Sequence, residues 1–393
     1  MNQVRFGLDV LRANPGGLRG RIGLVTNEAA RTSLDPSLTN RAALLNAGFQ
    51  LVRLFSPEHG LRASATDGAQ VADSVDPLTG LPVVSLYGET LCPPPAALAD
   101  LDAVGFDLPD IGARFYTYIW TLSHVLEACA EARVPLVVLD RPNPLGGELS
   151  AAEGPLLDVE NFRSFVGRAA IPIRHSLTSG ELARLWNAEW NLDADLRIIA
   201  CSGWTRAMHW PDTGLPFVQT SPAIASYKSA LLYPGLGLFE ATNLSVGRGT
   251  NCAFQVIGAP WLRADEVARH FNAYALPGVT VQTENFVPTL APYSGECCAA
   301  VRLLVSDAKS VRPVSAGLHL LATVVSLHPK DFGWAKYPTA ANPAGEKHFE
   351  RLVGRADIRE ALELNPHDLS EQVKAWTAVP TWGERVRRWR LYD

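Results

Sequence analysis

Short, nearly continuous apolar runs that alternate with helical stretches are the feature that most restricts the fold of this chain. The run at 134–140, VPLVVLD, is the most hydrophobic, and the segment 118–132 before it has apolar residues at helical spacing. Strands that are apolar on both faces must be covered on both faces, and helices between them allow a parallel sheet. The pattern therefore predicts an α/β fold with a parallel sheet and helices on both faces. The predicted strands are 21–27, 50–55, 81–88, 102–108, 134–140 and 196–201.

The helix predicted over 177–190 has a recognisable start. Thr178 or Ser179 is a suitable N-cap, and Glu181 lies in the first turn, where a carboxylate stabilises free backbone amides. Shorter helices are predicted over 40–48 and 95–101.

A smaller second domain is predicted in the C-terminal part of the chain. The segment 211–235 is rich in Pro and Gly and lies where the alternating pattern stops. Beyond it, 259–274 and 315–328 have helical patterns, and 298–307 reads as a strand between them. The expected domains are a catalytic α/β domain over 1–224 and a smaller α+β domain that closes the cleft over 225–393.

Composition excludes several classes of protein. The chain has 393 residues, is 47% hydrophobic and 19% charged, and carries a net charge of −5. The size suits a well-cored protein of two domains, and the negative charge argues against a nucleic-acid partner. No apolar stretch approaches the roughly 20 residues needed to span a bilayer. The first residues lack a signal-peptide pattern, so as written the chain is expected to be cytoplasmic.

Polar side chains lie at the ends of the first five predicted strands of the first domain. Because the carboxyl ends of parallel strands meet at one edge of a sheet, these groups are expected to form a polar pocket there. Each of them alone would also suit a helix cap or a turn. The groups are Thr26 and Asn27, Glu58 and His59, Tyr87 and Glu89, then Asp107, Asp110, Arg114, Tyr116 and Tyr118, and finally Asp140, Arg141 and Asn143.

The absence of several motifs limits the reactions and ligands that are expected for this pocket. The sequence has no dinucleotide fingerprint, phosphate loop, HExxH or GxSxG motif, and its six cysteines lack metal-ligand spacing. We therefore expect no cofactor and no metal. Carboxylates with Tyr, Arg, Asn and His suit a polyhydroxylated ligand, and a carboxylic acid suits glycoside hydrolysis.

Long motifs in a fixed order resemble the exo-β-N-acetylmuramidase (NamZ) family, formerly a family of unknown function (DUF1343). They include FSPEHG, DIGARFYTYI, LDRPNPLGG, IPIRHSLTSGELA, LLYPGLGLFEATNLSVGRGT and FERLVG. The resemblance implies a Rossmann-like domain with a smaller C-terminal domain and an active cleft between them. It also implies a glycosidase that removes N-acetylmuramic acid from the non-reducing ends of peptidoglycan fragments. Members are often exported, so a periplasmic or secreted location stays open.

The resemblance also implies two catalytic carboxylates. Glu58 matches the motif glutamate of the family and is expected to be the general acid, with a helix cap as the alternative. Glu153, in AAEGPLL, matches the second carboxylate. Its possible roles are nucleophile, base for water or orienter of the acetamido group, and a surface position is the alternative. Retaining, inverting and substrate-assisted mechanisms all stay open, because the choice depends on the carboxylate separation.

The remaining predicted site residues are expected to bind substrate. Arg114 and Arg141 would suit the lactyl carboxylate of muramic acid, or would instead pair with Asp107 or Asp140. Ser176 and Pro109 replace the residues usual in the family, and these changes bear on specificity more than on the reaction. The predicted binding residues are His59, Asp110, Arg114, Tyr116, Asp140, Arg141, Asn143, His175, Glu240, Asn243 and Arg248.

Three functions compete at this point. The first is an exo-acting muramidase, the second a glycosidase for a related 2-acetamido sugar, and the third a non-catalytic muropeptide-binding protein. The presence of Glu58 favours an enzyme.

Overall fold

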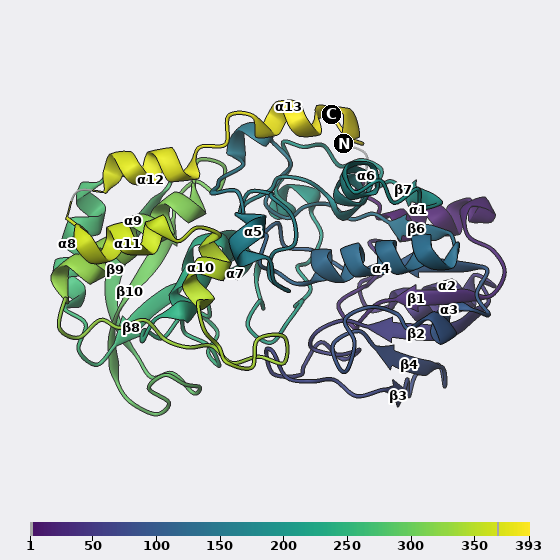
Figure 1. Cartoon of the computed structure of the whole chain (residues 1–393), viewed down its shortest axis with the longest axis horizontal. Helices are drawn as coiled ribbons and strands as arrows, with labels where there is room; N and C mark the ends of the chain where they lie inside the picture. The colour runs from purple at the N-terminus through teal and green to yellow at the C-terminus, as the bar shows by residue number, and fades with distance from the viewer. Residues whose placement is uncertain (1–2, 368) are drawn as a thin grey trace.

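The computed structural model describes residues 3–367 and 369–393 as two α/β units joined side by side (Figure 1). The first unit contains a seven-stranded sheet in the order β3-β4-β2-β1-β5-β6-β7. Six of its strands run parallel, which confirms the predicted sheet. β3 pairs antiparallel with β4, so the sheet is mixed and the prediction missed this short edge strand. The strands are β1 Ile22–Val25, β2 Leu51–Ser56, β3 Ser74–Val75, β4 Pro82–Ser85, β5 Ala103–Phe106, β6 Leu136–Leu139 and β7 Leu196–Ile199.

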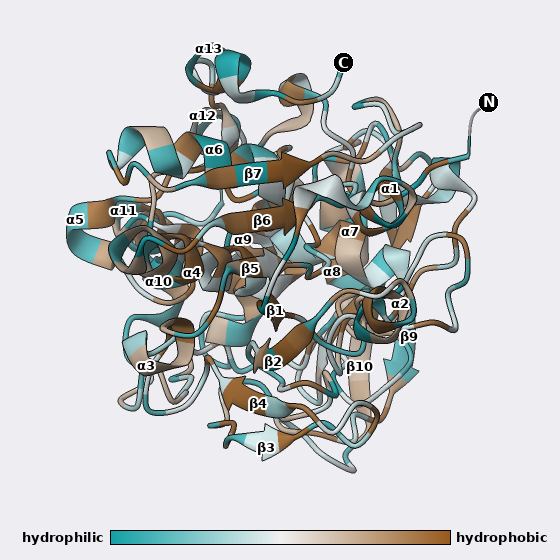
Figure 2. Ribbon diagram, turned by 90° about the vertical axis from the view of Figure 1, so that its right-hand side faces the viewer, coloured by the Kyte–Doolittle hydropathy of each residue, from teal (hydrophilic) through white to brown (hydrophobic). Residues whose placement is uncertain are grey.

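Helices cover both faces of this sheet. Successive residues of a strand point to opposite faces, so a strand that is apolar throughout places apolar side chains on both faces. In β6, Leu136 and Val138 join the apolar cluster under one set of helices, whereas Val137 and Leu139 join the cluster under the other. Figure 2 shows the central strands in the colour of hydrophobic residues. One face packs against α3 Pro95–Leu98, α4 Tyr118–Ala132 and α6 Ser179–Glu189, and the other against α1 Gly7–Ala13 and α2 Asn40–Asn46.

Two helix predictions are confirmed closely. α4 spans Tyr118–Ala132, as its apolar spacing predicts. α6 begins after Thr178, whose side chain accepts a hydrogen bond from the amide of Glu181, and the Glu181 side chain bonds back to Thr178. This reciprocal pair satisfies two amides that a helix start leaves free.

The second unit is built on a three-stranded antiparallel sheet in the order β8-β10-β9. β10 Cys298–Val305 was expected, whereas β8 Val256–Ala259 and β9 Val279–Phe286 were not. The helices around it are α7 Tyr227–Leu236, α8 Ala264–Ala273, α9 Pro313–Leu327, α10 His348–Val353, α11 Asp357–Leu364 and α12 Ser370–Thr377. The domain boundary expected between 224 and 225 stays a prediction.

Helices α7 and α9 approach each other through two glycines. A Cβ atom on Gly235 would lie 1.9 Å from the carbonyl oxygen of Pro313, and one on Gly317 would lie 2.6 Å from the Cα of Gly235. Larger residues would separate the two helices. The Pro- and Gly-rich segment that was expected as a boundary therefore contains part of a buried helix packed closely on α9.

The end of the chain returns to the first unit. Helix α13 Trp382–Val386 carries Arg385, which pairs with Glu189 of α6 at 2.6 Å. Beyond it, the Tyr392 hydroxyl donates to Asp140 at 2.6 Å, and Tyr392 packs with Val4 in a small apolar cluster. The two ends of the described chain therefore meet on one side of the sheet. Within the described residues, no helix is long and apolar enough to cross a membrane.

Candidate active site

A cavity lies where the carboxyl ends of β2 and β4 face the second unit. It encloses about 790 Å³ of open space including its mouth. The first unit supplies the loops after β2 and β4 and the start of α4, and the second supplies residues after α7 and around α10. A concave space between two domains is a typical place for a small-molecule site.

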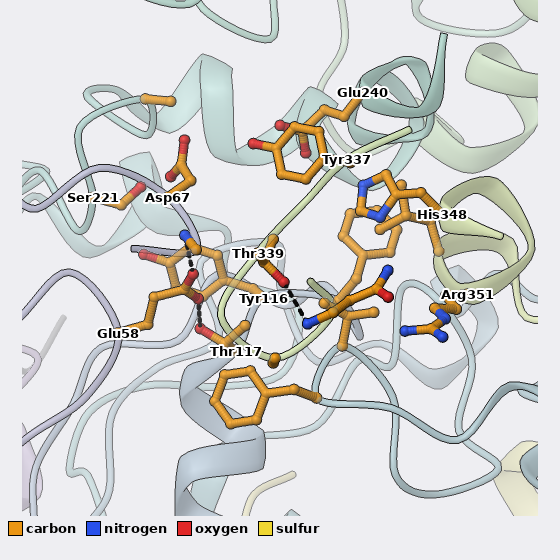
Figure 3. A pocket seen from close by; sticks show the side chains of 18 of the residues that line it. Glu58, Asp67, Tyr116, Thr117, Ser221, Glu240, Tyr337, Thr339, His348 and Arg351 are labelled. Atoms are coloured by element: carbon orange, nitrogen blue, oxygen red, sulfur yellow. Dashed lines mark hydrogen bonds between the residues drawn. The ribbon is translucent and has the colours of Figure 1, made fainter. Parts of the chain in front are cut away.

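Glu58 lies in this cavity at the turn that follows β2. The turn is formed by His59 and Gly60, both at positive φ, directly after the end of the strand. The Glu58 residue is 7% exposed. Its Oε1 accepts a hydrogen bond from the Gly68 amide at 2.8 Å, and its Oε2 lies 2.6 Å from the Thr117 hydroxyl (Figure 3). The carboxyl group is therefore held on both oxygens and does not point into bulk water.

The contact with Thr117 comes from the first turn of α4. Thr117 is at the N-cap position, but its side chain makes no capping hydrogen bond. The hydroxyl is thus free to face Glu58. A hydroxyl accepts a hydrogen bond from a carboxylic acid and donates one to a carboxylate, so this contact suits both protonation states of Glu58.

A second group of charges lies beside Glu58 and joins the two units. Arg248 pairs with Asp67 from the loop after β2 and with Glu240 from the second unit. His59 is 3.6 Å from Asp67. Burial raises the pKa of Glu240, Arg248 opposes this effect, and Asp67 adds to it. Two carboxylates share one guanidinium here, so negative charge is in excess at this end of the cavity.

Aromatic rings form much of the cavity wall. Burial raises the pKa of Tyr87, and the neighbouring Glu58 raises it further, so this tyrosine stays a neutral hydrogen-bonding group. The Tyr116 and Tyr233 rings meet edge to face at 6.1 Å. Aromatic faces with a few polar groups suit the apolar faces and hydroxyls of a sugar ring. The aromatic lining residues are Tyr87, Phe115, Tyr116, Phe165, Tyr233, Phe254 and Tyr337.

Five of the predicted site residues come together in this cavity. They are Glu58, His59, Tyr116, Glu240 and Arg248. The last two reach it from the second unit, as expected for residues that close the pocket from the other side.

Apart from Tyr116, the predicted polar groups after β5 and β6 do not line this cavity. Arg141 donates to Asp107 at 2.5 Å, which is the structural pair that the sequence left as an alternative. Asp140 is fully buried and accepts hydrogen bonds from Thr178, Gly180 and Tyr392. Burial raises the pKa of Asp140 to about 6. These groups tie the sheet edge to α6 and to the end of the chain.

Five other predicted residues are engaged elsewhere. Asp110 faces His175 at 3.2 Å, and Asn143 donates to the carbonyl of Leu177. Arg114 is fully buried and donates to backbone carbonyls, and burial lowers its pKa to about 9. Asn243 bonds to the backbone of 331 and 333. Asp110 lines a neighbouring hollow with Arg141 instead.

Glu153 lies in the first unit against the start of α9 and is 3% exposed. Its carboxylate accepts hydrogen bonds from the amides of Val314 at 3.3 Å and Ser315 at 2.9 Å. Burial raises its pKa to about 7, while Arg174 and these two amides pull it down. It is not among the residues that line the cavity. This position favours an anchoring role between the units, and a catalytic role stays a prediction.

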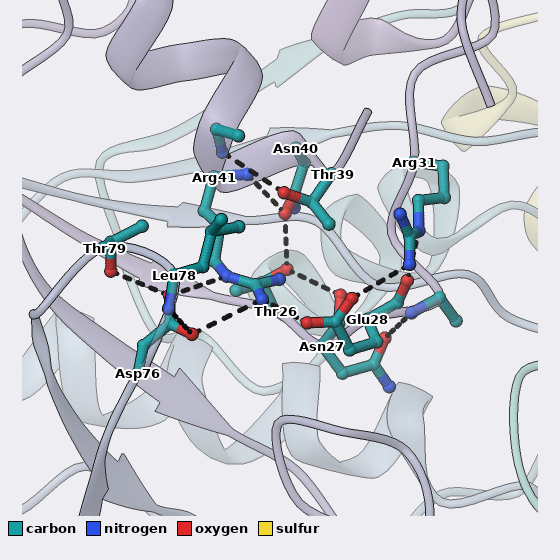
Figure 4. Close-up of polar contacts among 12 residues, drawn as sticks. Thr26, Asn27, Glu28, Arg31, Thr39, Asn40, Arg41, Asp76, Leu78 and Thr79 are labelled. Carbon is teal, nitrogen blue, oxygen red and sulfur yellow. Dashed lines mark hydrogen bonds and ion pairs between the residues drawn. The ribbon is translucent and has the colours of Figure 1, made fainter. Parts of the chain in front are cut away.

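The polar groups after β1 form a network of their own (Figure 4). Thr26 donates to Asn40 at 2.8 Å, and Arg41 donates to Asp76 at 2.8 Å and also pairs with Glu28. These contacts hold α2 and the β3 edge to the sheet.

Several cavity residues were not predicted. Asp67 follows the FSPEHG motif and Thr117 lies within DIGARFYTYI, but nothing in their spacing shows that they turn toward Glu58. Thr339 and His348 come from a segment near the end of the second unit with no periodic pattern, and Arg351 lies in the FERLVG motif, which was not expected to reach the site. Their positions depend on how the two units meet. Within residues 3–367 and 369–393, no group of three or more His, Cys, Asp or Glu side chains could hold a metal ion.

The fold and the cavity together define a two-domain α/β protein with a carboxylate-rich, aromatic-walled site between its domains. Comparison with known proteins gives the family. The model described as the N-terminal domain of exo-beta-N-acetylmuramidase NamZ matches residues 22–228, and that of the C-terminal domain matches residues 231–392. The chain belongs to this family of glycosidases.

Individual relatives agree with this assignment. The chain is 41% identical over 365 residues to the peptidoglycan beta-N-acetylmuramidase NamZ of Bacillus subtilis, covering 92% of this chain and 84% of that protein. It is also similar to two crystal structures of DUF1343 family proteins from Bacteroides fragilis. The first has a TM-score of 0.88 at 31% identity and the second 0.75 at 28%, and each match covers 100% of this chain and 99% of the other.

Proposed function

We propose that the chain is an exo-acting β-N-acetylmuramidase that removes N-acetylmuramic acid from the non-reducing end of peptidoglycan fragments, with Glu58 as general acid. The observation that carries this proposal is the buried carboxyl group of Glu58 inside an aromatic-walled cavity between the domains. The name of the Bacillus subtilis relative supports the substrate.

The general acid must deliver a proton to the oxygen of the leaving sugar. Glu58 lines the cavity and keeps its orientation through Gly68 and Thr117. Since the Thr117 hydroxyl accepts from the acid and donates to the carboxylate, Glu58 is held in the same place before and after proton transfer. Because Glu58 is already fixed in position, no conformational free energy is needed to orient it for proton transfer.

The charged residues beside Glu58 are suited to stabilise the transition state of the sugar ring. The transition state of glycoside cleavage carries positive charge at the anomeric carbon. Asp67 and Glu240 share the one guanidinium of Arg248, which leaves net negative charge near that carbon. We therefore assign the second catalytic carboxylate to Asp67 or Glu240, because these carboxylates line the cavity together with Glu58.

The test is the release of nitrophenol from para-nitrophenyl β-N-acetylmuramic acid, compared with the glucosamine analogue. We expect the wild type to cleave the muramic substrate, and Glu58→Gln to lower kcat by about 100- to 10,000-fold. Glu89→Gln is the matched control, because Glu89 also follows a strand of the sheet but is exposed. A Glu58→Gln protein with the wild-type rate would refute the assignment of the acid. A wild type that cleaves neither substrate would refute the proposed reaction.

A further inference from the structure

The end of the cavity away from Glu58 is electropositive and has unused hydrogen-bond donors. Two arginines line the cavity, and Arg248 is already engaged by Asp67 and Glu240. Arg351 makes no ion pair or side-chain hydrogen bond with any residue in the ranges 3–367 and 369–393. Its neighbour Glu350 pairs with Arg359 at 3.0 Å instead.

His348 stands one helical turn before Arg351 on α10, so the two side chains share a side of the helix. The His348 residue is 8% exposed, lines the cavity, and its Nε2 is buried without a hydrogen-bond partner in the described part of the chain. Its ring stacks on Tyr337, with ring centres 4.5 Å apart and planes 10° apart. A buried nitrogen without a partner costs free energy unless a ligand satisfies it.

Charge favours an anion at this end. Burial, with Arg351 and Arg248, lowers the pKa of His348 to about 4, so the ring is neutral and a nitrogen that carries hydrogen can donate. Figure 3 shows Arg351 and His348 on the opposite side of the cavity from Glu58. At the Glu58 end, Asp67 would repel an anion, whereas Glu240, which lies beside Tyr337, is paired with Arg248.

A muramyl sugar has one group that fits this end. Its lactyl ether is on the third ring carbon, two carbons from the anomeric centre, and ends in a carboxylate. A guanidinium binds a carboxylate through two parallel hydrogen bonds. N-acetylglucosamine has a hydroxyl at the same carbon and no such charge.

We propose that Arg351 and His348 form the subsite for the lactyl carboxylate, and that Arg351 is the residue that selects muramic acid over glucosamine. This inference rests on the proposed function, since it names a subsite for its substrate. It replaces the expectation that Arg114 or Arg141 has this role, because neither of those arginines lines the cavity.

Binding of the free sugars tests the subsite without turnover. Calorimetry would compare N-acetylmuramic acid with N-acetylglucosamine on the wild type, Arg351→Gln and Arg351→Lys. We expect the wild type to prefer muramic acid and Arg351→Gln to bind it about 10- to 100-fold more weakly, with glucosamine unaffected. Arg351→Lys keeps the charge but not the two parallel hydrogen bonds. Its affinity for N-acetylmuramic acid should therefore lie between those of the wild type and Arg351→Gln. Arg269→Gln is the matched control, because Arg269 is an exposed arginine of the same domain.

A second variant keeps the proposal testable if Arg351→Gln does not fold. His348→Phe retains the stack on Tyr337 and removes the nitrogen, so it should weaken muramic acid binding by about tenfold and leave glucosamine unchanged. With the nitrophenyl substrate, Arg351→Gln should raise KM far more than it lowers kcat.

The outcomes separate this proposal from the proposed function. Selective binding without nitrophenol release would support the carboxylate subsite and refute the reaction. Nitrophenol release with unchanged selectivity in Arg351→Gln would support the reaction and overturn the subsite. A wild type without preference for muramic acid would also overturn the subsite.

Discussion

Arg248 of the second domain donates a hydrogen bond to Asp67 of the first, although the two residues are 181 positions apart in the chain. The residue after Asp67 is Gly68, whose amide holds Oε1 of Glu58. The carbonyl of Gly68 in turn accepts from the amide of Ala340 at 2.7 Å. The second domain therefore contacts two adjacent residues of the loop that positions Glu58. The site is complete only when both domains are in place.

The Asp67–Arg248 pair should stabilise the protein and support catalysis. Asp67→Asn and Arg248→Met should each lower the free energy of unfolding and kcat, and the effects should not add, because both variants break the same contact. A double-mutant cycle by urea denaturation should give a coupling energy of about 0.5–3 kcal/mol. Arg269→Met, on an exposed helix face, should change neither quantity. Additive effects would show that the two residues act independently.

Gly68→Ala should inactivate the enzyme more than it destabilises it. Gly68 has φ +68°, and a Cβ atom there would lie 2.6 Å from Cβ of Thr339, so the loop would have to move away from Glu58. Gly80 is the matched control, since it has φ +71° but open space around a new Cβ. Both variants should lose about 1 kcal/mol from backbone strain. The kcat of Gly68→Ala should fall by at least about tenfold, as expected for a misplaced catalytic group. Equal activity in both variants would contradict the coupling.

Thr117→Val should lower kcat, because valine keeps the shape of threonine but removes the hydroxyl that contacts Glu58 at 2.6 Å. We expect a loss of about 10-fold, the value of one hydrogen bond to a charged group. The melting temperature should change little, because this side chain does not cap α4. Thr117→Ser restores the hydroxyl and should recover most of the activity. If the valine variant has the wild-type kcat, the contact does not serve catalysis.

Glu153→Gln should separate an anchoring role from a catalytic one. Its carboxylate binds the first amides of α9 and lies outside the cavity lining, so we expect kcat on the nitrophenyl substrate to stay within about threefold of wild type. A loss of 100-fold or more, with an unchanged melting temperature, would instead support a catalytic role. Exposed Glu371 provides the control substitution to glutamine.

The same variant should change how stability depends on pH. Burial raises the pKa of Glu153 to about 7, above its ordinary value near 4.5, so the folded protein keeps this proton to higher pH than the unfolded chain. Protonated Glu153 contributes to the free energy of unfolding. This contribution is fully present below about pH 4 and is lost as the pH rises through about 7. The free energy of unfolding should therefore fall more between pH 5 and pH 8, as rough limits of that window, in the wild type than in Glu153→Gln. Identical pH profiles from urea titrations would contradict this assignment.

Much of the first domain could be predicted because its signals are local. Successive residues of the apolar strand β6 point to opposite faces of the sheet, Leu136 and Val138 to one face and Val137 and Leu139 to the other. Apolar spacing gives the bounds of α4, and the Thr178–Glu181 capping box gives the start of α6. The four residues of β8 are too few to show a period, whereas β9 begins with the alternation of buried and exposed residues that is typical of a strand. The edge strand β3 was missed because it has only two residues.

The sequence by itself determined the sheet, its covering helices and the turn that carries Glu58, because each depends on neighbours within a few positions. Only the tertiary structure decided which strand ends share the cavity. In the observed strand order, β2 and β6 are separated by β1 and β5, which places their ends about 14 Å apart at the usual strand spacing. Asp140 and Arg141 therefore lie away from Glu58, while Arg248, His348 and Arg351 reach the cavity only through the docking of the second domain.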